Sequence, residues 1–236
     1  MVNSCAGETS FRARLAVGAV LLAAGAGSRM GGRPKSLLEL DGVPLIRRQL
    51  TALAGAGVSE VVVVLGHYAD AIESVVADCS VKFVHNLSPD DGQASSLRIG
   101  LQALVGKLDA VIIALADQPM IEAEDIAVLI DAFAGRDTGG VGGVRGIGDN
   151  GAMAVPRVAG EPGNPVIIDA TVIDEWLRGD INAAGRRWRE RNPERVLWFD
   201  TDNLHYRVDI DTPQDIEQFA ARTNRKLCWP DPPGSP

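Results

Sequence analysis

Short apolar runs alternate with longer segments in which apolar residues recur at helical spacing, most clearly in the first half of the chain. The apolar runs predict strands at residues 16–22, 61–65, 81–84 and 110–115. Helical spacing predicts helices at residues 43–57, 69–77, 94–105 and 121–133. Strands that alternate with helices in this way are typical of a parallel sheet flanked by helices.

The pattern is looser in the second half of the chain. It predicts strands at residues 166–168 and 196–199 and helices at residues 171–177 and 213–222. Thr212 and Asp215 have the spacing of a capping box at the start of the last helix. The glycine-rich stretch at residues 135–151 has little apolar periodicity and predicts a flexible loop or a hairpin.

These elements predict the α/β class: one Rossmann-like, doubly wound domain whose mostly parallel sheet has helices on both faces and a ligand at the carboxyl ends of its strands. We expect this domain at residues 15–224, with flexible tails at residues 1–14 and 225–236. The N-terminal region also has the basic start and apolar middle of a secretory signal. However, its small residues run directly into a basic loop that a mature secreted protein has no obvious reason to keep, so we favour a tail.

Composition narrows the function classes. A chain of 236 residues with 46% hydrophobic content supports one large domain. The formal charge of −8 argues against a nonspecific partner of nucleic acid or of an anionic membrane. Cys5, Cys79 and Cys228 are far apart and have no Cys-x-x-Cys spacing, which disfavours a disulfide framework or a zinc site. No apolar run reaches the roughly 20 residues of a membrane span. We therefore expect a cytoplasmic protein.

The first predicted strand leads into a loop with the chemistry of a phosphate site. Gly25 and Gly27 allow the backbone amides to converge, and converging amides bind anions. Arg29 then supplies a planar fork of donors and Lys35 a point charge. This combination suits a polyphosphate held in one pose.

Two better-known glycine motifs do not fit this loop. A P-loop requires glycine immediately before its lysine, whereas Pro34 precedes Lys35. A dinucleotide-binding fingerprint requires a third glycine at the position of Met30. The loop therefore predicts neither a P-loop NTPase nor a dinucleotide enzyme.

Acidic residues at two places could hold magnesium beside these phosphates. Asp117 follows the buried strand at residues 110–115, so its carboxylate should emerge at the same sheet edge as the loop. Asp209 and Asp211 alternate in an extended segment and would face the same side, so either could complete the site. A triphosphate normally arrives with Mg²⁺. The alternative for each acid is an ordinary helix cap or turn.

Other polar residues carry weaker signals. His67 lies at a strand end near the expected site, but a lone histidine is more often a hydrogen-bonding loop residue. Ser95 and Ser96 begin a helix, where they either cap free amides or hold a base or phosphate. Asn164, between Gly163 and Pro165, is typical of a turn.

Taken together, the motifs resemble those of the MobA-like nucleotidyltransferases, and within them the molybdenum cofactor cytidylyltransferases. Residues 22–35 look like the nucleotide loop of that family, and residues 38–45 look like the segment that follows it. The later motifs occur in the family's order, at residues 92–97 with Gly100 and Leu101, at 117–119, at 163–166 and at 209–215. The resemblance implies a fold like that of the nucleotide-diphospho-sugar transferases.

The resemblance also implies roles for individual residues. Arg29, Lys35 and Asp117 would be catalytic, Asp117 and Asp211 would hold Mg²⁺, and Asn164 and Asp180 would bind the acceptor. The implied nucleotide-binding residues are Leu22, Ala23, Ala24, Gly25, Gly27, Ser28, Arg29, Met30, Gly31, Lys35, His67, Ser95 and Ser96.

The implied reaction is transfer of CMP from CTP to the terminal phosphate of molybdopterin, with release of pyrophosphate and delivery to a molybdenum hydroxylase apoenzyme. CTP is favoured because relatives that use GTP typically have Gly-Gly where this chain has Ala24-Gly25, and a methyl group there crowds a purine. The compact Gly-Asp-x-Gly-x-Arg motif of relatives is interrupted here by residues 181–184, which leaves the acceptor open. A sugar or polyol phosphate acceptor and a catalytically idle nucleotide-binding chaperone are the alternatives. An oxidoreductase is disfavoured by Met30.

Overall fold

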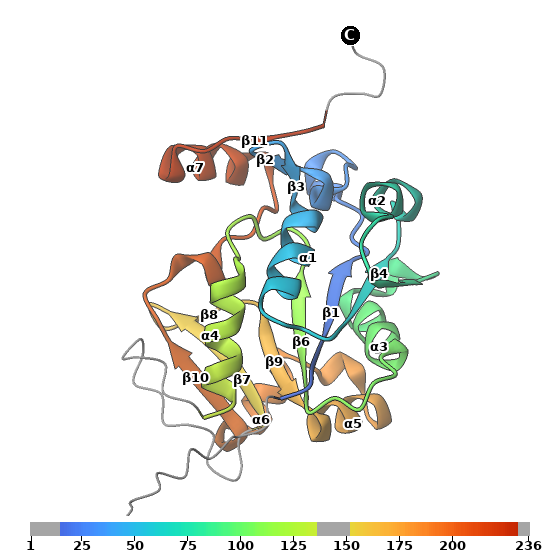
Figure 1. The fold of residues 1–236 in the computed structure, drawn as a ribbon, viewed down its shortest axis with the longest axis vertical. Helices are drawn as coiled ribbons and strands as arrows, with labels where there is room; N and C mark the ends of the chain where they lie inside the picture. Colours follow the sequence, from blue (N-terminus) through green and yellow to red (C-terminus); the bar gives the residue numbers. More distant parts are fainter. Residues whose placement is uncertain (1–14, 136–151, 231–236) are drawn as a thin grey trace, which may run out of the picture.

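One mixed sheet forms the centre of the molecule. The computed structural model describes residues 15–135 and 152–230. The strands of this sheet follow the order β10-β7-β9-β6-β1-β4-β5, and β8 pairs with β7 at its side (Figure 1). Their bounds are β1 Val17–Ala23, β4 Glu60–Leu65, β5 Lys82–His85, β6 Ala110–Leu115, β7 Met153–Val158, β8 Glu161–Pro162, β9 Val166–Asp169 and β10 Val196–Asp200.

The central strands are parallel, as the sequence predicts. β1 pairs with β4 and β6 in parallel register, and β4 pairs with β5 in the same way. β9 runs antiparallel to both β6 and β7, while β7 and β10 are parallel to each other. The expected doubly wound, mostly parallel α/β sheet is therefore confirmed, with β9 and the short β8 reversed in its second half.

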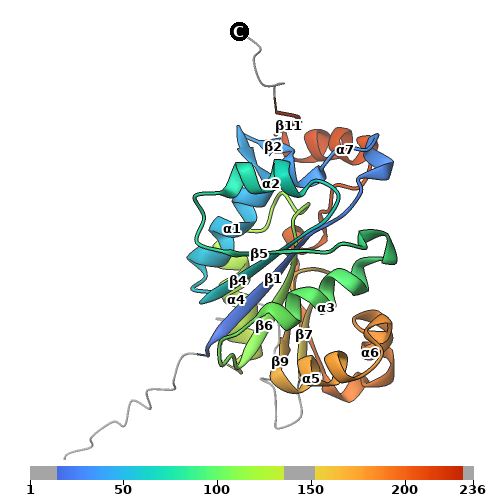
Figure 2. The same cartoon turned by 90° about the vertical axis from the view of Figure 1, so that its right-hand side faces the viewer.

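Helices cover both faces of the sheet (Figure 2). Helices α1, α2 and α4 lie on one side, and α3, α5 and α6 lie on the other. α7 lies beyond the carboxyl end of β1, next to β11 (Figure 1). Their bounds are α1 Leu45–Gly55, α2 Ala69–Val76, α3 Gln93–Ala103, α4 Ala123–Phe133, α5 Ala170–Arg178, α6 Arg186–Arg191 and α7 Pro213–Thr223.

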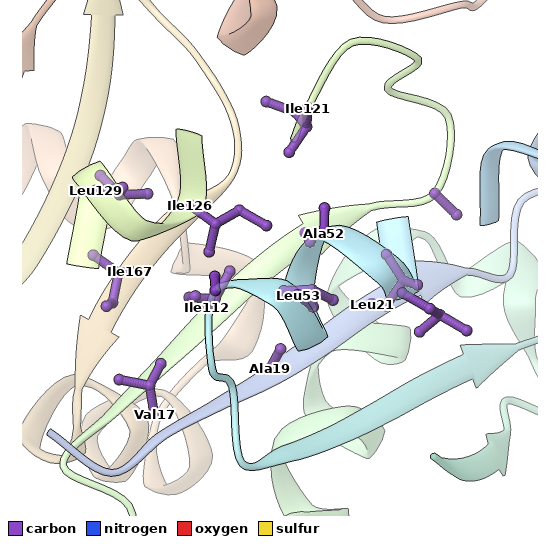
Figure 3. Packing of buried hydrophobic residues seen from close by; sticks show 14 of the residues in the cluster. Val17, Ala19, Leu21, Ala52, Leu53, Ile112, Ile121, Ile126, Leu129 and Ile167 are labelled. Carbon is purple, nitrogen blue, oxygen red and sulfur yellow. The ribbon is translucent and has the colours of Figure 1, made fainter. Parts of the chain in front are cut away.

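The two layers follow from the alternation of side chains along β1. Ala19 and Leu21 contribute to the apolar cluster under α1, α2 and α4, part of which is drawn in Figure 3. Val20 and Leu22 point to the opposite face and pack with α3, α5 and α6. Gly100 brings α3 close to the sheet, because a Cβ atom there would lie 2.4 Å from a methyl carbon of Val20. The sheet core is therefore buried on both faces.

A small second sheet lies next to α7 and corrects one expectation. It has the order β11-β2-β3, with β2 Glu39–Leu40, β3 Val43–Pro44 and β11 Leu227–Cys228. Leu227 is 3% exposed and packs with Leu40 and Phe219. The prediction of a flexible tail from residue 225 onward is therefore wrong for residues 225–230, because β11 anchors them to the domain.

Other differences concern irregular segments. β7 was not predicted, because Pro156 interrupts its apolar run directly after the glycine-rich stretch. That stretch, except for Gly135, lies outside the described residues, as do residues 1–14 and 231–236. The capping box of Thr212 and Asp215 is confirmed at the start of α7. Within the described ranges, no helix combines the length and hydropathy that crossing a membrane requires.

Candidate functional site

A cavity of about 350 Å³ lies at the carboxyl ends of β1 and β6. β1 delivers the start of the glycine loop to it, and β6 delivers Asp117 two residues after its last residue. The cavity is lined by Leu22, Ala23, Ala24, Gly25, Pro34, Lys35, Ser36, Tyr68, Ile72, Pro89, Gly92, Gln93, Ser96, Leu115, Ala116, Asp117, Asp209 and Asp211. Parallel α/β sheets bind ligands at this edge, as the sequence predicts.

The glycine loop has the tight backbone that its composition indicates. Gly27 adopts a φ of 58°, and its carbonyl accepts hydrogen bonds from the amides of Met30 at 2.8 Å and Gly32 at 3.1 Å. A Cβ atom on Gly27 would lie 2.0 Å from the carbonyl oxygen of Arg33, so a side chain cannot be accommodated. The Tyr68 hydroxyl lies 2.9 Å from the carbonyl oxygen of Ala26 and closes the loop from the α2 side.

Two cations and two carboxylates meet at the mouth of this loop. The Lys35 ammonium donates hydrogen bonds to the carboxylates of Asp117 and Asp211, the latter at 2.7 Å. Arg29 forms an ion pair with the other oxygen of Asp211 at 3.3 Å. The structure thus brings together Arg29 and Lys35, the predicted phosphate-binding cations, with two of the predicted magnesium ligands, Asp117 and Asp211.

The electrostatics of Lys35 and Asp211 reflect this contact. Burial opposes the charged form of Lys35, but Asp117 and Asp211 outweigh it and raise the pKa of its ammonium. The hydrogen bond from Lys35 lowers the pKa of Asp211, despite partial burial, and Arg29 adds to the effect. Both groups are therefore charged at neutral pH.

Asp209 has a different environment from Asp211. Burial raises the pKa of its carboxyl, and the nearby charges of Asp117 and Asp211 raise it further. Its polar contact in the structure is the Gln118 amide, which lies 3.5 Å away. Among the described residues, Lys35 therefore compensates Asp117 and Asp211, while Asp209 has only the more distant Arg207 and the Gln118 amide to offset its charge.

The donor set fits a hard divalent cation. The Oδ1 atom of Asp117 is buried and has no hydrogen-bond partner among the described residues, so this carboxylate has an unused ligand position. Its other oxygen and Asp211 already share one cation, the Lys35 ammonium. The part of the chain that the structure describes has no cluster of three or more candidate metal ligands. Two carboxylates supplemented by phosphate oxygens are typical of Mg²⁺ sites. Magnesium binding by Asp117 and Asp211 remains a prediction.

The remaining loop and base-side candidates are placed differently. Met30 is 5% exposed and packs into the apolar cluster near α7, so it does not line the cavity. His67 pairs with Asp90 at 3.1 Å and does not line it either. Of the two serines, only Ser96 lines the cavity. The cavity lining does not include Gly27, Ser28, Arg29 or Gly31.

Asn86 is a residue that the sequence analysis missed. It is 5% exposed and donates from its amide nitrogen to the hydroxyls of Ser95 at 2.8 Å and Ser96 at 2.9 Å. The Ser95 hydroxyl in turn donates to the carbonyl oxygen of Gly92 at 2.8 Å. The Ser96 hydroxyl, which accepts from Asn86, can donate to a ligand in the cavity that Ser96 lines. The only sequence signal was its position directly after a predicted strand.

A second cavity, of about 280 Å³, adjoins the first, and both are lined by Leu22, Gln93 and Leu115. Asn164 lines this second cavity, as expected for an acceptor-binding residue. Asp180 does not line it, because its carboxylate accepts from the backbone amide of Asn182 at 2.9 Å and caps the following turn. An acceptor role for either residue remains a prediction.

Comparison with protein families gives a match over most of the chain. Residues 19–196 match the family model of the MobA-like NTP transferase domain. Nicotine blue oxidoreductase of Paenarthrobacter nicotinovorans is 30% identical over 204 residues, which cover 85% of this chain and 93% of that protein. The CMP-5'-(3-aminopropyl)phosphonate synthase of Streptomyces rubellomurinus (strain ATCC 31215) is 40% identical over 88 residues. That match covers 35% of this chain and 14% of the length of the synthase.

A similar fold occurs among solved structures. A nucleotidyl transferase from Methanothermobacter thermautotroptrophicus (Mth528) superposes with a TM-score of 0.66 and 24% identity. The superposition covers 87% of this chain and 96% of that one. Together with the observed sheet, this similarity confirms the expected fold.

Proposed function

Because the chain belongs to the MobA-like NTP transferase family, we propose that it is a cytidylyltransferase that transfers CMP from CTP to a molybdopterin-type acceptor. The arrangement that supports this function most directly is the ammonium of Lys35 between the carboxylates of Asp117 and Asp211. It lies beside a glycine loop suited to a triphosphate. Nucleotidyl transfer at such a site requires both cations for phosphate and carboxylates for a metal.

In the proposed reaction, an oxygen of the acceptor's terminal phosphate attacks the α-phosphorus of CTP in line. A bond from that oxygen to the α-phosphorus forms, the bond from the α-phosphorus to the bridging oxygen breaks, and pyrophosphate leaves with the electron pair. Arg29 and Lys35 neutralise the charge on the departing pyrophosphate, so no covalent enzyme intermediate is needed. Mg²⁺ bound by Asp117 and Asp211 would add further charge neutralisation at the phosphates.

CTP is the proposed donor because of the side chain at residue 24. Ala24 lines the cavity and is 8% exposed, so its methyl group occupies space at the wall of the site. It lies close to the next loop, since a Cβ atom on Gly66 would be 2.9 Å from the Ala24 Cβ. The wall is therefore rigid, which favours the smaller pyrimidine. The match to a relative named CMP-5'-(3-aminopropyl)phosphonate synthase agrees with this choice.

The acceptor is proposed to occupy the second cavity beside Asn164, with the Asp180 turn at its edge. Delivery of the product to a molybdenum hydroxylase apoenzyme in the cytoplasm belongs to the same proposal. A sugar or polyol phosphate is the alternative acceptor. A catalytically idle nucleotide-binding chaperone is the alternative without chemistry.

Pyrophosphate release separates these possibilities. The protein is incubated with Mg²⁺, with CTP or GTP, and with molybdopterin, a sugar phosphate or a polyol phosphate in turn. The proposal predicts pyrophosphate only when CTP and molybdopterin are combined. Release with a sugar or polyol phosphate would identify the alternative acceptor. Nucleotide binding without pyrophosphate from any combination would indicate the idle chaperone.

A redox function is the second candidate. It is favoured by one observation: a relative that matches across 85% of this chain is named nicotine blue oxidoreductase. A redox function requires a nicotinamide or similar dinucleotide, and the loop here lacks the third glycine of the usual fingerprint. Oxidation of NADH or NADPH in the presence of a quinone-type dye would support it. The proposed transferase leaves both dinucleotides unchanged.

A further inference from the structure

We propose that the second cavity contains an anion subsite in which Arg189 binds the negatively charged group of the acceptor. Arg186 lines the same cavity and adds positive charge. The inference rests on the proposed function for the identity of the anion as an acceptor phosphate. The binding chemistry itself depends only on the residues that line the cavity.

Arg189 is a half-buried cation, and the neighbouring Glu190 pairs with Arg186. Its guanidinium lies over the ring of Trp198, 5.7 Å from the ring centroid, and no ion pair joins it to a carboxylate among the described residues. Burial lowers the pKa of Arg189, and the neighbouring charge of Arg186 lowers it further. A desolvated guanidinium in this state gains more from an incoming anion than an exposed one does.

The cavity itself is selective for negative charge. Arg186 and Arg189 line it, whereas its described lining contains no Asp or Glu. The chain as a whole has 31 acidic and 23 basic residues, so a lining whose two charged residues are both basic is a local departure from its composition. Arg186 is bonded to Glu190 at 2.8 Å on the exposed surface, which makes Arg189 the principal group.

Neutral donors complete the subsite. Trp176 lines the cavity and is 3% exposed, yet its indole N–H has no acceptor among the described residues. Asn164 and Asn182 also line the cavity, and the Asn182 amide donates one hydrogen bond to Asp180 at 3.0 Å. A phosphate has several acceptor oxygens, so it would use a guanidinium and neutral donors together. A buried donor without a partner is costly unless a ligand satisfies it.

The position of this subsite matches an attacking phosphate. The two cavities meet at Leu22, Gln93 and Leu115. Neither Arg29 nor Lys35 lines the second cavity, so the cations for the nucleotide and those for the second anion are separate sets. An acceptor phosphate on Arg189 would therefore lie beside the nucleotide instead of competing for its site.

The binding test uses inorganic phosphate as the probe and tryptophan fluorescence as the signal, since Trp176 and Trp198 lie at the subsite. We expect Arg189→Ala and the longer Arg189→Gln to weaken phosphate binding about tenfold or more, and Arg189→Lys to restore part of it. Arg187→Ala is the matched control, because Arg187 is exposed on the same helix and does not line the cavity. Titrations are repeated in Lys35→Ala, which removes a cation of the nucleotide cavity only.

The outcomes keep the two proposals apart. Equal phosphate binding by the wild type and both neutral Arg189 variants, or no binding by the wild type, would overturn the subsite. Loss of phosphate binding in Lys35→Ala alone would place the phosphate in the nucleotide cavity and would also overturn the subsite.

If the Arg189 variants lose phosphate binding while the wild type transfers no nucleotide to any acceptor, the subsite stands and the proposed function fails. If transfer occurs, Arg189→Gln should raise the KM of the acceptor and leave that of CTP unchanged.

Discussion

Lys35 compensates two carboxylates that would otherwise repel each other at the carboxyl end of the sheet. Its ammonium contacts Asp117 and Asp211, and these two carboxylates raise the pKa of the ammonium. When a metal ion binds with a triphosphate, the metal can neutralise the two carboxylates and the phosphates can pair with Lys35. We therefore expect substrate and metal to replace this internal pairing together.

The two acids of the 209–211 segment should differ in function. Asp211 contacts Lys35 and Arg29, whereas the hydrogen bond of Asp209 within the described residues is to the Gln118 amide. Asp211→Asn should lower Mg²⁺-dependent turnover about 100-fold or more, while Asp209→Asn should retain most of it. Measuring turnover against Mg²⁺ concentration tests this assignment. The reverse order of the two variants would identify Asp209 as the ligand.

Ala24→Gly should broaden the choice of nucleotide. Removing a methyl group from the cavity wall makes room for a purine, and one methylene in a pocket changes discrimination roughly tenfold or more. The ratio of kcat/KM for CTP to that for GTP should therefore fall by about this factor. An unchanged ratio would show that residue 24 does not read the base.

At the residue scale, charge was easier to predict from the sequence than neutral polarity. Arg29, Lys35 and Asp117 occur at strand ends and in a glycine loop, where charged residues carry a clear signal. Asn86 and Tyr68 carry little sequence signal, because their roles depend on hydrogen bonds to residues that the fold brings near. His67 was predicted from its position alone, and in the structure it pairs with Asp90 instead.

At the scale of elements, periodicity predicted most strands and helices of the parallel half. β6 occupies the same residues, Ala110–Leu115, as the predicted strand. β2, β3 and β11 have two residues each, too short for a periodic signal. β2 and β3 form a local hairpin around Asp41 and Gly42, whereas β11 pairs with β2 from a distant segment. Short pairing of this kind is set by tertiary contacts, so a sequence pattern does not contain it.

Leu227 in β11 provides a test of that small sheet. The side chain is buried with Leu40 and Phe219, so Leu227→Ala should lower the free energy of unfolding by about 2 kcal/mol or more. Cys228→Ala is the matched control, because Cys228 is exposed in the same strand. Urea denaturation of both variants measures the difference. Equal stability would mean that residues 227–228 do not anchor the chain.

At the scale of the whole molecule, ion-paired carboxyl groups make the free energy of unfolding depend on pH. The hydrogen bond from Lys35 lowers the pKa of Asp211, and that from Arg157 lowers the pKa of Asp200. Carboxyl groups with lowered pKa stabilise the fold above their unfolded value of about 3.9, and this contribution is lost as the pH falls through their folded pKa.

The free energy of unfolding should therefore decrease as the pH is lowered below about 4. Asp209 acts in the opposite direction, since burial and its acidic neighbours raise the pKa of its carboxyl. Asp209→Asn should accordingly stabilise the ligand-free protein at pH 7. Urea titrations from pH 7 to pH 3 test both expectations. A wild type that becomes more stable on acidification, or an Asp209→Asn variant that is less stable at pH 7, would contradict them.

The central claim is that Lys35 and Asp117 perform nucleotidyl transfer from CTP. The most direct measurement follows CTP with a labelled α-phosphate into the acceptor and counts the pyrophosphate formed in the same reaction. We predict one pyrophosphate for each labelled product. The rate of label transfer should fall about 100-fold or more in Lys35→Ala and Asp117→Ala. It should not change in Lys226→Ala, because Lys226 is exposed and does not line the cavity. Unchanged label transfer in Lys35→Ala and Asp117→Ala would contradict the claim.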